Sequence, residues 1–513
     1  MEKMQFLNYE KFTPRLYQEL IAATAVKKNT LCILPTGLGK TFIAILVSAY
    51  KLEESIDSKI LMIAPTRPLV NQHLETFKKS MYVDESKLIG LTGKIHRDDR
   101  KVLYEKGQVF FTTPQIVRND VDNKILNLEK FSLLIIDECH RSVKQYAYTE
   151  VTERYFKSAL KPLVLGLTAS PGGIKDKIDE VKKNLRIEAV EIRTEKDEDV
   201  KPYVKETEVH RVYVEFPEEF QKISRLLKDV YEEKISALIR ARLLQSSRVS
   251  KREILDLQME LGKMYSETKD YAVARMLVVC AQTIKIEHAI GLLETQGIVQ
   301  LNKYFLEMEK NKSSANKHLL NDVKVLQAIK LTKELYLNGT EHPKLGKLLE
   351  IIKKDVSEKK NTKIIVFANY RDTVERIVKL LNKSGIEARE FIGQAKKSGK
   401  GLSQKEQIQL LNEFGYEIFN VLVCTSIGEE GLSIPAVDIV MFYEPVPSEI
   451  RTIQRRGRTG RTETGKVIFL ITKGTRDESY YWTAYHKEKR MRSIIDTMKE
   501  NNSEKRKVSD WLE

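Results

Sequence analysis

The residues near the N-terminus that are best suited to chemistry form a short run of glycine, lysine and threonine after an apolar stretch. Its members are Thr36, Gly37, Leu38, Gly39, Lys40 and Thr41. Two glycines let successive backbone N–H groups turn toward an anion, and a helix that starts after them adds the positive end of its dipole. Lys40 would then reach the β- and γ-phosphates of ATP, and the Thr41 hydroxyl would hold Mg²⁺. Leu34 stands where the usual phosphate loop has its first glycine, so the match is incomplete.

A second candidate is an acidic pair at the end of an apolar run. Residues 133–136 read Leu-Leu-Ile-Ile, and Asp137 and Glu138 follow directly. A strand that ends in this way places its carboxylates at the carboxyl edge of a sheet, where ligands bind in α/β folds. We expect Asp137 to hold Mg²⁺, directly or through water, and Glu138 to orient and deprotonate the attacking water. Acidic pairs at strand ends are common, but the distance of about one hundred residues from the phosphate loop favours the catalytic interpretation.

A third candidate lies near the C-terminus, where arginines alternate with glycines. An arginine that reaches the γ-phosphate during phosphoryl transfer neutralises developing charge and accelerates the reaction by roughly 10³–10⁵. We expect Arg458 and Arg461 to do this, with Gln454 beside them, because the two arginines would share one face of a helix. Arg455 and Arg456 are expected to pair with acids instead. A solvated basic run is the alternative, which the interleaved glycines disfavour.

The composition indicates a large protein of several domains with a polyanionic partner. A chain of 513 residues exceeds what one core usually serves, so two to four domains are expected. Its formal net charge of +15 favours nucleic acid as the partner, although a lysine-rich composition alone is the alternative. The four cysteines include no C-x-x-C pair, which gives no sign of a metal site and fits a reducing, cytoplasmic interior. No stretch of about 18 uncharged apolar residues is present, so we expect no membrane contact.

The pattern of apolar runs divides the chain into four parts. Short apolar runs alternate with amphipathic stretches over residues 1–204 and again over residues 346–490, which is typical of parallel sheets flanked by helices. Residues 205–345 carry long amphipathic segments and are expected to form helices. Residues 491–513 are polar and charged, and we expect the end of a helix and then a frayed tail. The predicted fold is therefore α/β, with an all-helical insertion between two parallel-sheet domains.

Taken together, these motifs resemble those of superfamily 2 helicases of the DEAH/DECH-like kind over nearly the whole chain. The resemblance implies RecA-like folds for both sheet domains, with ATP bound in the first. Arg15 and Gln18 resemble the motif that recognises adenine, and Gly431 belongs to a stretch that resembles a nucleotide-binding and coupling motif of the second domain. Thr168 and Ser170 resemble the motif that couples hydrolysis to strand contact.

The same resemblance implies a row of contacts to the nucleic-acid backbone. The expected contact residues are Arg67, Thr92, Gly93 and Thr113 in the first domain and Gly393 and Thr425 in the second. Hydroxyl and backbone N–H groups suit phosphate contacts that are made and released at every step. Residues 396–400 carry three lysines and read as a loop that contacts phosphate or, equally well, as a solvated loop. The helical insertion would add a third wall to the groove, although helices of this length more often serve packing.

Two longer strings narrow the resemblance to Hef, the archaeal relative of FANCM. Residues 400–407 read Lys-Gly-Leu-Ser-Gln-Lys-Glu-Gln, and residues 442–451 read Phe-Tyr-Glu-Pro-Val-Pro-Ser-Glu-Ile-Arg. The resemblance implies an ATP-dependent helicase or translocase that acts on branched DNA, such as stalled forks and Holliday junctions, in the nucleoid of an archaeal-type cell. Hef proteins often continue into a nuclease domain that this sequence does not show. We therefore expect any cleavage to come from a separate nuclease or repair factor.

Two other functions stay open at this point. The general motifs also allow an RNA-directed ATPase of the RIG-I or Dicer kind, although residues 404–407 favour the DNA-directed group. The third reading is an ATP-gated binding platform that recruits repair factors without unwinding or translocating. No sequence feature argues against hydrolysis, so this platform ranks last.

Overall fold

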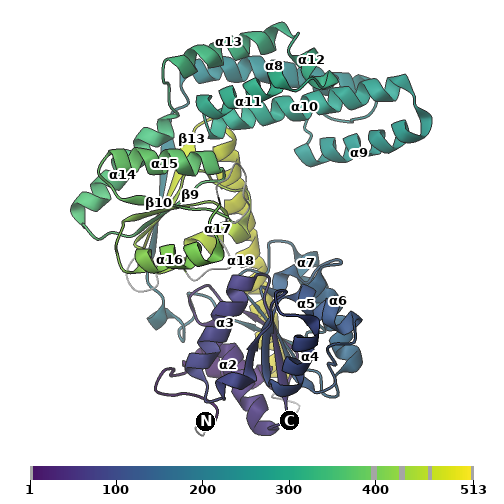
Figure 1. Cartoon of the computed structure of the whole chain (residues 1–513), viewed down its shortest axis with the longest axis vertical. Coiled ribbons are helices and arrows are strands. Elements are labelled where there is room, and N and C mark those ends of the chain that lie inside the picture. The colour runs from purple at the N-terminus through teal and green to yellow at the C-terminus, as the bar shows by residue number, and fades with distance from the viewer. Residues whose placement is uncertain (1–3, 394–400, 427–433, 460–464, 510–513) are drawn as a thin grey trace.

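The structure is a computed structural model that describes residues 4–393, 401–426, 434–459 and 465–509, apart from the side chains of residues 501–509. The described residues form two sheet-containing lobes and a helical bundle, arranged along the longest axis of the molecule (Figure 1). The N-terminal lobe lies at one end, the bundle lies at the other, and the second lobe lies between them.

The first lobe is built on a seven-stranded sheet whose paired strands all run parallel. In order across the sheet, its strands are β3 (Leu88–Gly90), β4 (Val109–Thr112), β2 (Lys59–Ile63), β5 (Phe131–Asp137), β6 (Val164–Thr168), β1 (Thr30–Ile33) and β7 (Ala189–Ile192). The helices of this lobe are α1 (Leu16–Ala25), α2 (Lys40–Glu54), α3 (Arg67–Ser80), α4 (Arg97–Lys106), α5 (Pro114–Asp122), α6 (Ala147–Ser158) and α7 (Lys175–Asn184). Successive side chains of a strand point to opposite faces, so Leu31 and Ile33 enter one apolar core and Cys32 enters the other.

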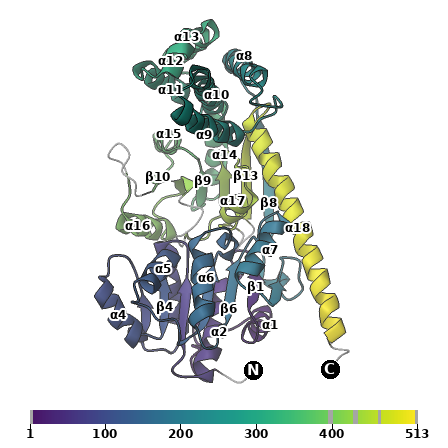
Figure 2. The same cartoon turned by 90° about the vertical axis from the view of Figure 1, so that its right-hand side faces the viewer.

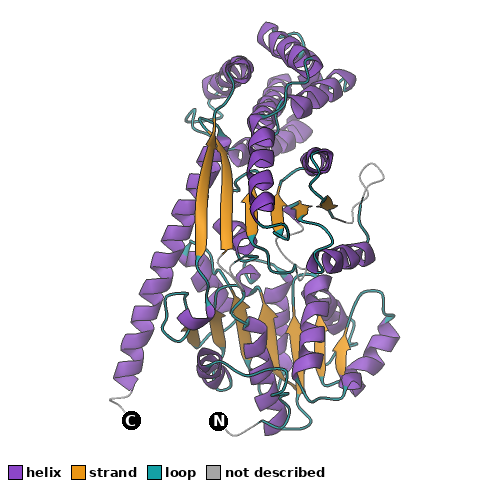
Figure 3. Ribbon diagram, turned by 90° about the vertical axis from the view of Figure 1, so that its left-hand side faces the viewer, coloured by secondary structure: helices purple, strands orange, loops and turns teal. Residues whose placement is uncertain are grey.

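The second lobe repeats this plan with a six-stranded parallel sheet (Figure 3). In order across the sheet, its strands are β10 (Ala388–Phe391), β11 (Val421–Cys424), β9 (Ile364–Phe367), β12 (Ile439–Phe442), β13 (Gly465–Thr472) and β8 (Thr207–Val214). Its helices are α14 (Pro343–Glu358), α15 (Arg371–Lys383), α16 (Gln404–Gly415), α17 (Glu449–Arg456) and the first part of α18 (Arg476–Ser509). Here too the strands divide between two cores, with Ile364 in one and Ile365 in the other.

Between β8 and α14 the chain forms the helical bundle. Its helices are α8 (Glu218–Arg240), α9 (Lys251–Thr268), α10 (Tyr271–Thr295), α11 (Ile298–Lys310), α12 (Ser314–Leu319) and α13 (Val323–Leu337). By length and composition alone, α10 is the one helix among the described residues that would be able to cross a membrane. In the bundle it has the position of a core helix, because its side chains contribute to both apolar clusters. The expected α/β fold, with two parallel sheets and a helical insertion between them, is thus confirmed.

The expected boundary at residue 205 differs from the structure. Strand β8 belongs to the sheet of the second lobe, where it pairs with β13 from Thr207 to Val214. The helical part of the insertion therefore runs from the start of α8 to the end of α13. Most side chains of β8 are exposed, because β8 is an edge strand. It consequently lacks the apolar run that marks a central strand in the sequence.

The polar tail expected at residues 491–513 is instead occupied by helix α18 as far as Ser509. This helix leaves the second lobe and runs along the side of the molecule to the first lobe (Figure 2). There Met491 and Ile495 join an apolar core of the first lobe, and Lys499 forms an ion pair with Asp197. The two apolar residues are four apart and lie on one helix face. They are sparse among charged residues, which explains why the sequence pattern suggested a tail.

The docking of α18 can be tested with one substitution. Ile495 is 6% exposed, so we expect Ile495→Ala to destabilise the protein by about 2–5 kcal/mol through the loss of buried methyl groups. Chemical denaturation followed by circular dichroism would measure the effect. The matched control is Ile408→Ala on α16, where the side chain is 46% exposed and little change is expected. Equal stabilities of the two variants would contradict the docking of α18.

Candidate active site

The loop after β1 has the backbone that a phosphate cradle requires. Gly37 and Gly39 have φ values of 84° and 81°, in the left-handed region that favours glycine. Gly39 is also the residue that precedes α2, so the helix starts with Lys40 directly after the loop. Lys40 Nζ donates to the carbonyl of Leu34 at 3.2 Å, which keeps the ammonium group at the loop. The loop thus offers an anion the N–H groups and the positive end of α2.

Residues from the first helix hold this loop from the other side. Tyr17 Oη and Gln18 Nε2 both donate to the carbonyl of Leu38, at 2.7 Å and 3.2 Å. Gln18 Oε1 accepts the backbone N–H of Arg15 at 3.0 Å, and the Arg15 guanidinium lies 4.1 Å from the ring centroid of Tyr203. The two residues expected at the adenine, Arg15 and Gln18, therefore lie beside the phosphate loop. Gln18 also braces the loop, which the sequence alone did not indicate.

The two expected ligands of Mg²⁺ lie on either side of one histidine. His73 Nε2 is 2.8 Å from Asp137 Oδ2, and His73 Nδ1 is 3.4 Å from Thr41 Oγ1. Asp137 Oδ1 accepts the backbone N–H of Glu138 at 3.0 Å. Burial acts to raise the pKa of Asp137, but His73 and then Lys40 favour the charged carboxylate, and the net result is a lowered pKa. An ionised carboxylate and a hydroxyl form an oxygen donor set that fits Mg²⁺.

Glu138 is connected to the coupling motif through His140. Glu138 has a φ of 51°, an uncommon backbone conformation that turns the chain sharply after β5. Its Oε2 lies 3.2 Å from His140 Nδ1, and the same nitrogen lies 3.0 Å from Thr168 Oγ1. Thr168 Oγ1 in turn accepts the backbone N–H of Ser170 at 3.2 Å. The expected catalytic base and the expected coupling residues, Thr168 and Ser170, thus form one connected group.

The arginine motif of the second lobe lies directly against the phosphate loop. A Cβ atom placed on Gly457 would be only 1.9 Å from Thr36 Oγ1, so the two lobes are in tight contact there. A second link joins α17 to the loop that follows the coupling residues Thr168 and Ser170. There Glu449 Oε1 accepts the backbone N–H of Gly173 at 3.2 Å. Arg458 is half-buried and follows Gly457 directly. Arg461 and Gly431 lie outside the described residues.

Three side chains of α17 have different environments. Gln454 is 4% exposed, and neither of its buried amide atoms has a hydrogen-bond partner among the described residues. Arg456 forms an ion pair with Glu488 of α18 at 2.9 Å, as expected for an arginine that pairs with an acid. Arg455 is fully buried, lies over the ring of Phe367 and donates to an asparagine of the same lobe.

The expected nucleic-acid contacts of the first lobe lie at the carboxyl ends of three neighbouring strands. Arg67 follows β2, Thr92 and Gly93 follow β3, and Thr113 follows β4. A Cβ atom on Gly93 would lie 3.4 Å from Arg67 Nη2, so these two residues are adjacent. Arg67 is the first residue of α3, and Thr113 immediately precedes α5. Two helix N-termini therefore meet at this edge, which suits phosphate groups.

The second lobe shows a corresponding set. Gly393 follows β10 and Thr425 follows β11, while Arg371 begins α15 after β9. Arg371 Nη2 donates to the carbonyl of Gly393 at 3.0 Å. The lysine-bearing loop expected at residues 396–400 lies outside the described residues. Arg371 is a further candidate for contact with the backbone of a nucleic acid.

Two residues of these sites were missed by sequence reasoning. His73 touches both expected metal ligands, but a single histidine within an amphipathic helix gives no signal in the sequence. Arg371 begins a helix directly after a buried strand, in the same way as Arg67 in the first lobe. This shared position, an arginine at the start of the helix after a buried strand, is a signal for Arg371 that appears only when the sequences of the two lobes are compared.

Glu138 provides the first test of the site. Glu138→Gln keeps the size of the side chain but removes the carboxylate, so we expect the rate of ATP hydrolysis to fall by about 10²–10⁴. Binding of a fluorescent ATP analogue should stay close to that of the unchanged protein, because the phosphate loop is intact. Glu105→Gln, at an exposed position of the same lobe, serves as the control. Hydrolysis at the rate of the control would remove Glu138 from its assigned role.

The contact between the lobes provides a second test. Gly457 has a φ of −64°, which alanine adopts freely, so the effect of Gly457→Ala depends on space alone. The added methyl group collides with Thr36, and we expect the displacement of the arginine motif to lower kcat by about 10²-fold.

Steady-state ATPase assays and thermal melts would separate this effect from unfolding. Gly346→Ala is the matched control in the same lobe, because nothing lies within 4 Å of a Cβ atom there. A G457A variant with an unchanged kcat would show that hydrolysis does not need this close approach.

Comparison with known proteins identifies the family. Residues 8–173 match the family described as "Type III restriction enzyme, res subunit", residues 343–463 match "Helicase conserved C-terminal domain", and residues 219–336 match "Putative ATP-dependent RNA helicase, helical bundle". The crystal structure of the Pyrococcus furiosus Hef helicase domain is similar with a TM-score of 0.73 and 42% sequence identity, over 94% of this chain and 100% of that chain.

Two curated relatives extend this likeness over nearly the whole chain. The "Putative ATP-dependent RNA helicase" of Methanocaldococcus jannaschii is 46% identical over 94% of this chain, which spans 61% of the relative. The "ATP-dependent DNA helicase MPH1" of Pyricularia oryzae is 34% identical over 94% of this chain, which spans 46% of that protein. The chain thus spans less than two thirds of either relative. It belongs to the superfamily 2 ATP-dependent helicases, in the group that includes Hef, FANCM and MPH1.

Proposed function

We propose that this chain is an ATP-driven translocase that remodels branched DNA, such as stalled forks and Holliday junctions, during the repair of replication forks. The observation that carries the proposal is the close approach of Gly457 to Thr36, which supports an ATP site built from both lobes. A triphosphate bound there would hold the lobes together, and its hydrolysis would let them separate. Opening and closing of two lobes that each touch a nucleic acid is the physical basis of stepwise movement.

The chemistry of the site follows from its own residues. Lys40 and the loop N–H groups bind the phosphates, and Arg458 approaches the γ-phosphate from the second lobe. For Arg461 the same role stays a prediction from the sequence. Glu138 accepts a proton from the attacking water, and His140 lies 3.2 Å from the Glu138 carboxylate. Gln454 and its unsatisfied amide orient groups at the same point.

Thr41 and Asp137 would hold Mg²⁺, which neutralises charge on the β- and γ-phosphates when it is bound. Both oxygens of Asp137 already accept hydrogen bonds, from His73 and from the backbone of Glu138. Mg²⁺ keeps several of its waters in proteins, so contact through water suits this carboxylate.

The nucleic acid in this proposal lies along the sheet edges of both lobes. Arg67, Thr92, Gly93 and Thr113 belong to one lobe and Gly393 with Thr425 to the other, all at carboxyl ends of strands. Hydroxyl, guanidinium and backbone groups of this kind contact phosphates rather than base edges, so we expect binding without sequence preference.

We propose DNA rather than RNA as the substrate because of the relatives that this chain resembles. MPH1 is named an ATP-dependent DNA helicase, and the Hef helicase domain is similar over 94% of this chain. The Methanocaldococcus relative is named for RNA, and this keeps an RNA-directed ATPase as the second candidate. Separate nucleases or repair factors are proposed as partners that process the remodelled DNA.

A panel of nucleic acids tests the choice. We expect the ATPase rate to rise most with forked or four-way DNA, less with linear duplex and least with double-stranded RNA, measured at a single fixed salt concentration. Strand displacement or branch migration on the same substrates would be recorded in parallel.

Each remaining outcome selects another function. Stimulation by double-stranded RNA above that by branched DNA would establish the RNA-directed candidate. Hydrolysis without any displacement or migration would instead favour a binding platform gated by ATP.

A further inference from the structure

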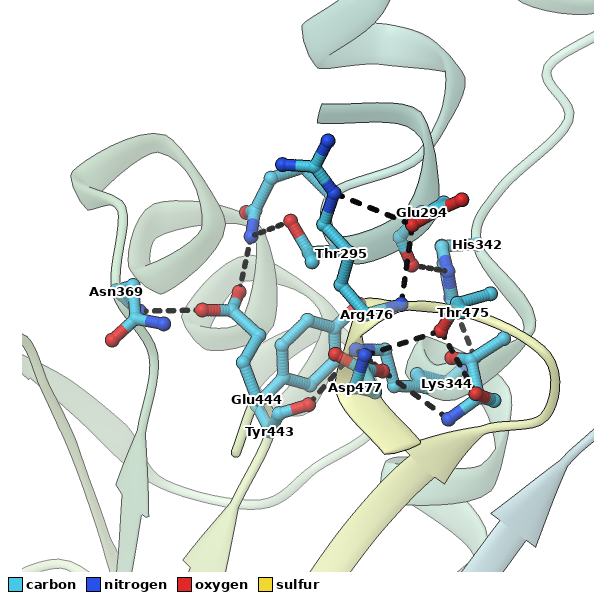
Figure 4. Close-up of polar contacts among 12 residues, drawn as sticks. Glu294, Thr295, His342, Lys344, Asn369, Tyr443, Glu444, Thr475, Arg476 and Asp477 are labelled. Atoms are coloured by element: carbon cyan, nitrogen blue, oxygen red, sulfur yellow. Dashed lines mark hydrogen bonds and ion pairs between the residues drawn. The ribbon is translucent and has the colours of Figure 1, made fainter. Parts of the chain in front are cut away.

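The bundle and the second lobe meet at a joint that is buried and polar. It brings together the C-terminal end of α10, the start of α14, the residues after β12 and the start of α18 (Figure 4). The polar groups in it include Glu294, Gln296, His342, Lys344, Glu444 and Asp477, each less than 5% exposed. Burying a polar group without a hydrogen-bond partner is costly. The partners of these residues therefore show which elements of the bundle and of the second lobe are held together.

On the bundle side, Gln296 is the residue that directly follows α10 and caps its C-terminal end. Its Nε2 donates to Glu444 Oε1, and its Oε1 accepts the hydroxyl of Thr373 on α15. The end of the central bundle helix is therefore hydrogen-bonded to two separate elements of the second lobe.

On the other side, Glu444 leads to the arginine motif. Glu444 Oε2 accepts the backbone N–H of Asn369 at 2.9 Å, and Asn369 Oδ1 accepts a hydrogen bond from Arg455 Nη2 at 3.3 Å. Arg455 lies in α17, two residues before the Gly457 that abuts the phosphate loop. One continuous chain of hydrogen bonds thus runs from Gln296 through Glu444 and Asn369 to the arginine motif.

The frame around this chain is stiff. Lys344 and Asp477, both fully buried, form an ion pair at 2.7 Å, and Lys344 also donates to the carbonyl of Tyr443 at 3.1 Å. The backbone N–H of Arg476 donates to Glu294 of α10 at 3.1 Å. Tyr443, the residue before Glu444, is therefore held by Lys344, and α10 is joined to the start of α18.

We propose that Glu444 is a positioning residue for ATP hydrolysis, which transmits the placement of the helical bundle to the arginine motif. A shift of α10 moves Gln296, Gln296 moves the Glu444 carboxylate, and Asn369 then moves the Arg455 guanidinium. Nucleic acid held by the bundle would in this way adjust the arginines that meet the γ-phosphate. This last link rests on the proposed contact between the bundle and nucleic acid, whereas the link from Glu444 to Arg455 does not.

An exchange of the two side chains tests the proposal. In E444Q the charge at residue 444 is lost, and the new amide meets Gln296 only if Gln296 turns its own amide over and exchanges donor for acceptor at Thr373. In Q296E two carboxylates face each other. In the double variant Q296E/E444Q, the new amide at 444 accepts from the backbone of Asn369 and donates to the new carboxylate at 296. That carboxylate can still accept from Thr373, so the continuous chain of hydrogen bonds is restored.

We expect each single variant to lower kcat for ATP about tenfold while KM for ATP stays unchanged, because the phosphate loop lies in the other lobe. The double variant should recover to within about threefold of the unchanged protein. The kcat of each variant would be measured twice, once without nucleic acid and once with the nucleic acid of the panel that stimulates hydrolysis most. Loss in both assays reports the link to Arg455, and loss only in the stimulated assay reports the link to the bundle.

A second bridge between the same two parts serves as the control. Lys303 of α11 forms an ion pair with Asp372 of α15 at 2.7 Å, with side chains 58% and 44% exposed. Lys303→Ala should leave kcat unchanged, because exposed ion pairs contribute little and this one does not lead to α17.

Two results would overturn the proposal. One is an unchanged kcat in E444Q, and the other is a double variant no better than the worse single variant at an equal melting temperature. If no nucleic acid stimulates the protein, the assay without nucleic acid still tests Glu444, so the proposal and the proposed function fail separately.

Discussion

The direct contact between Gly457 and Thr36 is the constraint on which the rest of the structure depends. No side chain fits between these residues, so the arginine motif can reach the phosphate loop only through backbone that carries no Cβ atom. With ATP bound at the phosphate loop as we propose, this contact would make the site a shared property of the two lobes. It also makes hydrolysis sensitive to any small change in the angle between the lobes, because an arginine acts only when it reaches the transferred phosphate.

Parallel sheets explain how two binding functions share one lobe. All strands of such a sheet end at the same edge. The order of the strands across the sheet therefore separates the groups of residues that could bind different ligands at this edge. In the first lobe, β2, β3 and β4 end in the candidates for nucleic acid, whereas β1, β5 and β6 end in the residues of the ATP site. The second lobe repeats the division, with β9, β10 and β11 on one side and α17, which follows β12, on the other.

What the sequence could predict depended on how local each signal is. The phosphate loop, the acidic pair after β5 and the central strands were predictable, because each is specified by neighbouring residues. Strand β8 lies within the range expected for the helical insertion, because its partner β13 lies far along the chain and the pairing leaves no local signal. His73 and the long course of α18 were not foreseen, since both matter only through contacts with distant residues.

The polar character of the joint at Glu444 is consistent with a role in setting the orientation of the bundle relative to the second lobe. A well-packed apolar joint would be at least as stable as one with buried ions, because taking charges out of water is costly. Hydrogen bonds, however, are directional and prefer a narrow range of angles, whereas apolar contacts have no preferred direction. The hydrogen bonds from Gln296 to Glu444 and from the backbone of Arg476 to Glu294 therefore define one angle between the bundle and the second lobe. A change in this angle would displace Asn369 and with it the Arg455 guanidinium, to which Asn369 is hydrogen-bonded.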